Sequence, residues 1–255
     1  MRRKISAILV TVLIMLTVMP MGAFAAVPSV QEVETLIAQI GTVTRENRSA
    51  VENAVNAYNQ LDDASKAGVS NFDVLAEAQQ ILGIKDALAK LNVEHDRVEN
   101  NYTISDSYAE STLNTGLCMI APSICVYGDR DELVLMISFV YVGDELLNAN
   151  RVIVRAGDNK YTYNQDAFSA IGRDVCKINT GKLKWVEGFV TRAEDFDIEL
   201  LRDALSSQEA IFRFSGYQNY AYVLTQQNRQ AITDVLNAYN LMCSVSPDVL
   251  RKALA

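Results

Sequence analysis

Apolar residues in the first third of the chain recur at the spacing of an amphipathic helix. Ser29, followed three residues later by Glu32, predicts a capping box at the first helix start, and Thr44 and Asn71 are expected N-caps further on. Short helices of this kind bury little surface alone, so we expect them to pack on one another. The pattern predicts a small α-helical bundle from four segments at 30–40, 44–61, 62–69 and 71–91.

From about residue 94 the apolar positions change to the period of two that is typical of β-strands. Helical patterns return at 195–206 and at 226–242, where Thr225 is the expected N-cap. A mostly antiparallel β-sheet with covering helices, placed behind a helical bundle, belongs to the α+β class, which is the fold class that we expect. The expected strands lie at 133–142, 151–155, 160–163, 183–190, 210–214 and 220–224.

The N-terminus has the three parts of a secretory signal peptide. Arg2, Arg3 and Lys4 form a basic start, an apolar core follows, and Ala23-Phe24-Ala25 matches the cleavage pattern. The apolar core is shorter than the roughly 20 residues that a membrane-spanning helix needs. We therefore expect cleavage, export and no membrane association afterwards. The predicted organisation is a signal peptide at 1–25, a helical module at 27–92, a linker or the start of the second domain at 93–109, and an α+β domain at 110–255.

Three short motifs recur within the helical segment: an Ile-Gly-x-Val-Thr turn, an Ala-Tyr-x-x-Leu helix end and a Val-x-Asn-x-x-x-Leu segment. In this pattern the segment resembles a small helical module of exported and surface proteins of Gram-positive bacteria. The loop at 62–66 departs from the pattern of that family. The resemblance implies a spacer or an appended interaction module without catalytic residues. The matching residues are Ile40, Gly41, Val43, Thr44, Ala57, Tyr58, Leu61, Val69, Asn71 and Leu75.

The C-terminal half combines Arg213-Phe214-Ser215-Gly216, Tyr220 and Leu224 with a helix that carries Ala231-Ile232, Val235-Leu236 and Ala238-Tyr239. In these residues it loosely resembles an uncharacterised domain of exported bacterial proteins. The resemblance implies export and assigns no function to any residue.

The chain of 255 residues has 23 Lys and Arg against 31 Asp and Glu, a formal net charge of −8. This acidic balance argues against nucleic acids and anionic membrane surfaces as partners, because both recruit clusters of Lys and Arg. An even number of cysteines in an exported chain suggests disulfides. Cys118 and Cys125 are close enough in sequence for a local bridge that would leave Cys176 with Cys243, although the sequence allows three connectivities.

Little in the sequence predicts catalysis. His95 is the one histidine, and it lies in a polar stretch that favours a solvated side chain. The cysteine spacing is too open for zinc, the acidic runs fit no calcium loop, and no nucleotide-binding motif occurs, so neither a metal nor a cofactor is expected. Glu187, two residues after Trp185 on a predicted strand, is the one candidate for carboxylate catalysis of glycoside hydrolysis.

Aromatic residues are the better candidates for binding. Trp185 could stack on a sugar ring if its strand face is open. Tyr220 and Tyr222 share a strand face near Tyr217, and this face forms either an exposed flat surface or one side of a sheet packed under a helix. The candidate binding residues are therefore Trp185, Tyr217, Tyr220 and Tyr222.

These observations predict an exported, non-catalytic binding or adhesion protein, secreted or associated with the cell surface, with an unidentified ligand in the cell wall or outside the cell. Two alternatives stay open: a glycan-cleaving enzyme of the cell wall that uses Glu187 and a second carboxylate, or a purely structural spacer. An enzyme needs a concave site with a carboxylate of raised pKa, a binding module needs an exposed patch, and a spacer needs neither.

Overall fold

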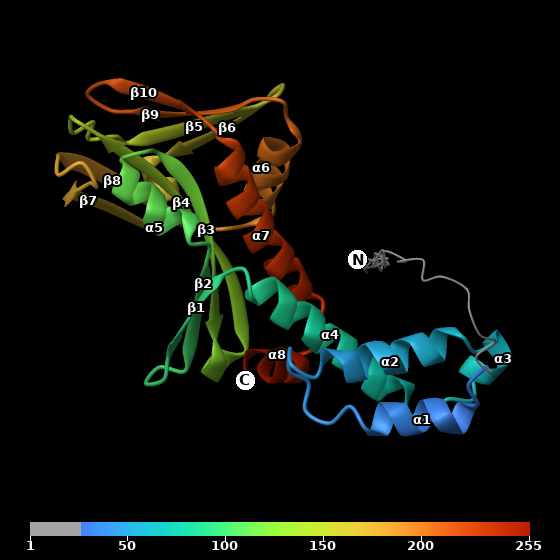
Figure 1. Ribbon diagram of the computed structural model, residues 1–255. Coiled ribbons are helices and arrows are strands. Elements are labelled where there is room, and N and C mark those ends of the chain that lie inside the picture. The colour runs from blue at the N-terminus through green and yellow to red at the C-terminus, as the bar shows by residue number, and fades with distance from the viewer. Residues whose placement is uncertain (1–26) are drawn as a thin grey trace.

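The computed structural model describes residues 27–255, so the predicted signal peptide at 1–25 lies outside the described residues. The fold confirms the α+β class: short helices gather at one end of the molecule, and two antiparallel sheets form the other end (Figure 1). The long helix α7 (Gln226–Cys243) runs from the sheets toward the N-terminal helices (Figure 1). Within the described part of the chain, no helix is both long and apolar enough to span a membrane.

The N-terminal helices begin close to where the sequence predicts them. The capping box is present, and the Ser29 hydroxyl accepts a hydrogen bond from the Glu32 amide at 3.3 Å. The second helix begins later than predicted, because Thr44 and Asn47 hydrogen-bond each other's backbone amides and Asn47 becomes the N-cap. Asn71 is the N-cap of the last helix, but its side chain donates to a carbonyl of the first helix. The helices are α1 (Val30–Ala38), α2 (Arg48–Asn59), α3 (Asp63–Lys66) and α4 (Phe72–Leu88).

Sheet A has six antiparallel strands in the order β1-β2-β3-β4-β8-β7. Residues 93–109, which the sequence left open as a linker or a domain start, contain most of the hairpin β1–β2 and belong to this sheet. The sequence pattern missed both hairpin strands as well as β3 and β7. The edge strands β1 and β7 are largely exposed and therefore lack apolar alternation. The strands are β1 (Asn92–Asp96), β2 (Asn101–Ser105), β3 (Met119–Tyr127), β4 (Glu132–Gly143), β7 (Ala170–Lys177) and β8 (Leu183–Arg192).

Sheet B has four antiparallel strands in the order β10-β9-β5-β6. Val152 and Val154 face the core from β5, and they pair with Phe214 and Phe212 of β9. The ring of Phe214 lies 5.9 Å from that of Phe189 on β8, so sheets A and B pack face to face. The strands are β5 (Arg151–Ala156), β6 (Asn159–Asn164), β9 (Ala210–Ser215) and β10 (Asn219–Val223).

The remaining helices cover the sheets and join the two ends of the molecule. Helix α5 packs on the outer face of sheet A through Leu113, and α6 covers the core face of sheet B. Helix α7 begins at the predicted N-cap Thr225, whose hydroxyl accepts from the Asn228 amide. Helix α8 packs on α4, where Lys252 pairs with Glu77 at 2.5 Å. These elements are α5 (Tyr108–Thr115), α6 (Asp195–Ser206), α8 (Pro247–Leu254) and the short turns η1 (Gly128–Arg130) and η2 (Gln165–Ala167).

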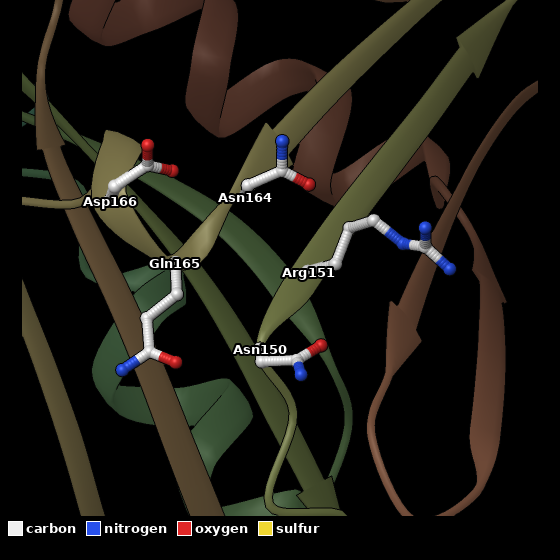
Figure 2. A pocket seen from close by; sticks show the side chains of 5 residues that line it. All are labelled: Asn150, Arg151, Asn164, Gln165 and Asp166. Atoms are coloured by element: carbon white, nitrogen blue, oxygen red, sulfur yellow. The ribbon is translucent and has the colours of Figure 1, made fainter.

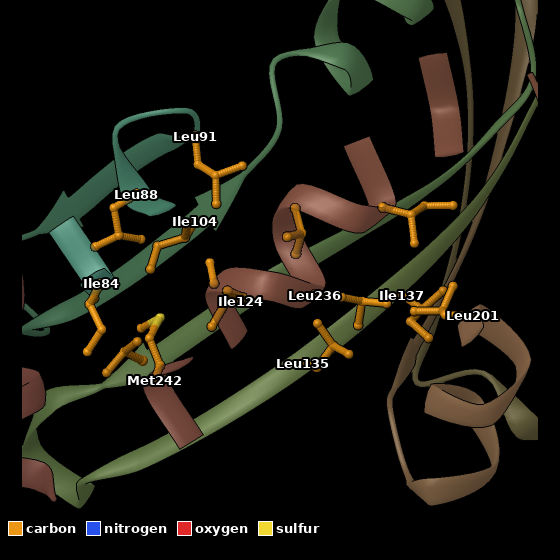
Figure 3. Packing of buried hydrophobic residues seen from close by; sticks show 14 of the residues in the cluster. Ile84, Leu88, Leu91, Ile104, Ile124, Leu135, Ile137, Leu201, Leu236 and Met242 are labelled. Carbon is orange, nitrogen blue, oxygen red and sulfur yellow. The ribbon is translucent and has the colours of Figure 1, made fainter. Parts of the chain in front are cut away.

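One hydrophobic core continues from the N-terminal helices into the sheets. Figure 3 shows Ile84 of α4 near Met242 of α7, followed by Leu236 further along the same helix. Leu135 of β4 and Leu201 of α6 extend the same cluster. The helical module and the sheets are therefore held together by shared buried side chains.

Candidate functional site

Sheet B has one face on the core and one face open to solvent. Along β5, Val152 and Val154 are fully buried, whereas Arg151 and Arg155 are exposed. Alternate residues of a strand point to opposite faces, and helices α6 and α7 lie on the buried side (Figure 1). The outward residues of the four strands form a surface that we name the basic face: Arg151, Ile153, Arg155, Lys160, Thr162, Asn164, Ile211, Arg213, Ser215, Asn219, Ala221 and Val223.

Four cations lie on the basic face, which has no carboxylate among its residues. Arg155 stands directly opposite Lys160 on β6, and Arg213 of β9 stands opposite Ile153. Arg151 and Arg155 flank Ile153 along β5. Strands are about 4.8 Å apart and outward residues of one strand about 6.8 Å apart, so the four Cα atoms lie within about 15 Å.

The positive charge of the basic face is unbalanced. Within residues 27–255 none of Arg151, Arg155, Lys160 and Arg213 forms an ion pair. Like charges directly opposite each other on neighbouring strands, as Arg155 and Lys160 are, destabilise a sheet. Binding of an anion would relieve this repulsion.

The surface of the basic face has two shallow hollows. The first, of about 370 Å³, lies at its centre between the cations and the aliphatic side chains of Ile153 and Ile211. The second, of about 690 Å³, lies at the end of β5 and β6 and is lined by Asn150, Arg151, Asn164, Gln165 and Asp166 (Figure 2). In Figure 2 the side chains of Arg151 and Asp166 point away from each other, so this carboxylate leaves the guanidinium available.

The four predicted aromatic binding residues do not share one exposed surface. Tyr220 and Tyr222 point to the core side of β10, where Tyr220 packs on Tyr141 and Tyr222 on Phe212, at ring-centre distances of 5.2 Å and 5.6 Å. Tyr217 is 77% exposed in the turn between β9 and β10. Trp185 is half-buried on β8. Tyr220 and Tyr222 therefore belong mainly to the packing between layers.

Glu187 is a fully buried carboxylate with all its capacity engaged. It accepts hydrogen bonds from the amides of Leu147, Asn148 and Ala149 at 2.6, 2.9 and 2.8 Å. The Arg173 guanidinium lies 3.2 Å from its second oxygen and also donates to the Ala149 carbonyl. These contacts fix the loop between β4 and β5, and they leave no carboxylate oxygen directed at a substrate.

The four cysteines that were predicted to form disulfides carry free thiols. Cys118 immediately precedes β3 and Cys125 lies near its end, so an extended strand separates their Cα atoms by about 20 Å. A disulfide needs a Cα separation of about 4.4–6.8 Å, so the predicted local bridge is wrong. Cys176 on β7 and Cys243 at the end of α7 are also unbridged. Burial raises the pKa of the Cys118 thiol to about 11, which keeps it protonated and unreactive.

The other polar clusters have structural places. Among residues 27–255 no three His, Cys, Asp or Glu side chains gather into a metal-binding group. His95 stacks on Tyr102 in the β1–β2 hairpin, with ring centres 4.0 Å apart. In the acidic run at 195–199, the Asp197 carboxylate accepts from the Tyr163 hydroxyl at 2.5 Å and from the backbone amide of Glu194.

A third hollow, of about 460 Å³, lies away from the basic face, between α8 and the ends of β2, β3 and β4. Apolar side chains such as Leu133, Met242 and Leu250 line most of it. Arg251 also lines this hollow, and its guanidinium pairs with Asp131 at 2.6 Å and with Asp248. Its charges therefore neutralise each other, in contrast to those of the basic face.

The sequence contained a signal for the basic face that charge totals concealed. Residues 151–155 read Arg-Val-Ile-Val-Arg, so a predicted strand already carried both cations on one side. The contribution of Arg213 depends on the pairing of β5 with β9, which links residues far apart in the chain. In comparisons with family models, curated protein sequences and solved structures, no match to this chain was found.

Proposed function

We propose that this chain is an exported, non-catalytic binding protein that acts at the cell surface or in the secreted milieu and holds an anionic partner on its basic face. One observation carries the proposal. In a chain of net charge −8, four cations that have no ion-pair partner within residues 27–255 gather on one open sheet face. Such an arrangement lowers stability by itself, and an anionic ligand compensates for it.

The two alternatives fit the described residues less well. A glycan-cleaving enzyme that depends on Glu187 would need an accessible carboxylate, whereas Glu187 is buried and its oxygens accept from three amides and from Arg173. A spacer would need no unbalanced charge on an open face. The N-terminal helices fit the proposal as a scaffold, because they share their core with the rest of the protein.

Co-sedimentation of purified residues 26–255 with cell-wall sacculi tests the proposal. The double variant Arg155→Glu/Arg213→Glu removes the charge of the basic face. The matched control, Arg97→Glu/Arg202→Glu, makes the same charge change at exposed residues of the β1–β2 hairpin and of α6. Soluble sugar in the supernatant is measured in parallel.

We expect the natural chain and the control variant to sediment, the face variant to stay in solution, and no sugar to be released. Sugar release would contradict the non-catalytic proposal and make Glu187→Gln the next variant to assay. Equal sedimentation of the two variants would show that the basic face is not the binding surface. Absence of sedimentation for the natural chain would exclude the wall as its partner.

A further inference from the structure

We infer that the free edge of β7 pairs with the same edge of a second copy of this chain, in antiparallel direction and across a two-fold axis at Arg173. This pairing joins two six-stranded sheets into one continuous sheet. The inference concerns sheet A, so it goes beyond the function proposed for the basic face of sheet B and does not rest on it.

Strand β7 is the longest edge strand in the described part of the chain. It has 8 residues, against 5 for β1, 6 for β6 and 5 for β10. Within residues 27–255 its one strand neighbour is β8, and in Figure 1 it lies at the outer margin of the sheets, far from the N-terminal helices. A long edge of unpaired backbone groups is a template for another strand, and β7 contains no proline that would block it.

The hydrogen bonds next to β7 show which of its backbone groups face outward. The Ile178 amide donates to the Lys182 carbonyl at 2.9 Å, so by alternation the even-numbered residues of β7 direct their backbone groups to β8. The odd-numbered residues of 171–177 therefore direct their amides and carbonyls away from β8. The Val175 amide donates to the Asp174 carboxylate at 2.7 Å, a contact that a carbonyl of an added strand would replace.

Two antiparallel registers use nearly the whole strand and keep matching faces together, and they differ in their charges. A two-fold axis at Asp174 sets two carboxylates opposite each other in a pair without backbone hydrogen bonds, where Cα atoms are only about 4.5 Å apart. An axis at Arg173 sets two arginines in a hydrogen-bonded pair, at about 5.5 Å. Each Arg173 guanidinium already turns to its own chain, because it donates to Glu187 and to the Ala149 carbonyl. Charge therefore selects the axis at Arg173.

This register also extends the apolar rows on the core side of sheet A. It places Val175 of each copy opposite Ile171 of the other. Within one chain, Val175 pairs with Trp185 and Ile171 with Phe189 on β8. Residues directly opposite each other share a sheet face, so a row of four apolar side chains crosses the boundary, and it occurs twice. Because Val175 is 40% exposed in the single chain, the edge is complementary to itself and a second copy covers it.

Sedimentation equilibrium of residues 26–255 over a range of concentrations, under reducing conditions, tests the pairing. We expect the mass to rise with concentration from that of one chain to that of two. Val175→Lys introduces a charge into both apolar rows and should weaken the association by at least about tenfold. The matched control is Val93→Lys on β1, the opposite edge of sheet A, where the side chain is 42% exposed. This variant should associate like the natural chain.

A cysteine placed opposite the natural thiol of Cys176 tests the register. With the axis at Arg173, residue 170 of one copy faces Cys176 of the other, whereas an axis at Asp174 puts residue 172 in that place. During oxidation with diamide, Ala170→Cys should form a disulfide-linked dimer, because two facing thiols give up two protons and two electrons to diamide and form one S–S bond. Gly172→Cys, at a position where a Cβ meets nothing within 4 Å, should stay unlinked. Cys176→Ser in the Ala170→Cys background should abolish the link.

A mass of one chain at every concentration would overturn the inference. Equal association of the Val175→Lys and Val93→Lys variants would show that β7 is not the interface, and stronger linkage of Gly172→Cys than of Ala170→Cys would overturn the register. These outcomes leave the sedimentation of the protein with sacculi through the basic face untouched, so the proposed function stands or falls separately.

Discussion

At the scale of single residues, Glu187 shows how a side chain that resembles a catalytic group serves the structure instead. It holds three consecutive amides of the β4–β5 loop, although 38 to 40 residues separate it from them. A sequence reveals the strand position of Glu187 but not the loop that folds back onto it. The capping residues Ser29 and Thr225 were predictable, because their partners lie three residues away.

Glu187→Gln should lower the free energy of unfolding by about 3 kcal/mol, because breaking a buried ion pair leaves polar groups without partners. Trp185 on the same strand provides a fluorescence signal for urea denaturation. The exposed Glu199→Gln is the matched control and should change stability by less than about 0.5 kcal/mol. Equal effects of the two substitutions would show that Glu187 is not needed to hold the loop.

Asp203 couples stability to pH. Hydrogen bonds from the Tyr161 hydroxyl and the Asn159 amide, both 2.5 Å long, lower the pKa of this carboxyl below its usual value. An unfolded Asp has a pKa of about 3.9, so the stabilisation is present above that pH and is lost as the pH falls through the lower folded pKa.

Asp203→Asn should therefore lose less stability than the natural chain between about pH 5 and pH 2, which is the interval in which an Asp of lowered pKa titrates. Denaturant unfolding at a series of pH values measures this slope. The control is Asp158→Asn, the same substitution at an exposed residue of the turn between β5 and β6. A slope in the Asp203→Asn variant that matches the natural chain would contradict the link.

At the scale of elements, prediction succeeded where one face of a helix or strand is buried. The strand at 151–155 and the helix at 195–206 show clear alternation or helical spacing, and both are present. It failed at β1 and β7, which are edge strands with little buried area, and at β3, where Pro122 interrupts the strand pattern. The order of strands in each sheet depends on pairings between distant segments, which local patterns do not encode.

Gly216 lies where the turn between β9 and β10 contacts the loop between β4 and β5. A Cβ atom there would lie 2.2 Å from the Leu147 carbonyl oxygen and 2.7 Å from backbone atoms of Asn148. Gly216→Ala should force the loops apart and destabilise the protein by about 1–3 kcal/mol. On β7, a Cβ at Gly172 would meet nothing within 4 Å, so Gly172→Ala is the control. Similar melting temperatures for the two variants would contradict the close contact.

At the scale of the whole molecule, the sequence predicted two parts, and the structure joins them through a common core. The two parts have different apolar periods, which suggested separate units. Helix α4 packs against α7 and α8, so residues from the C-terminal end complete the N-terminal bundle. This joining could not be predicted, because the matching apolar faces are far apart in the chain.

Ile84→Ala should test whether the shared core makes unfolding cooperative. Ile84 is fully buried in α4, and truncation of such a residue costs about 2–5 kcal/mol. We expect helical circular dichroism, to which the N-terminal helices and the helices on the sheets both contribute, to shift to lower denaturant together with Trp185 fluorescence, which reports on sheet A. Val74→Ala, at a 52% exposed position of the same helix, should leave both signals nearly unchanged. Two separate transitions would show that the halves unfold independently.

The contact between α4 and α8 also affects the order in which parts of the protein fold. Glu77 and Lys252 lie 175 residues apart in the chain. During synthesis, the side of α4 that packs on α8 therefore has no partner until α8 has been made. Contacts of such long range close slowly, because a large loop must be ordered before they form. For a chain exported as proposed, this delay is an advantage. The N-terminal bundle stays incomplete until the C-terminal helices are made, so the chain stays unfolded enough to be translocated.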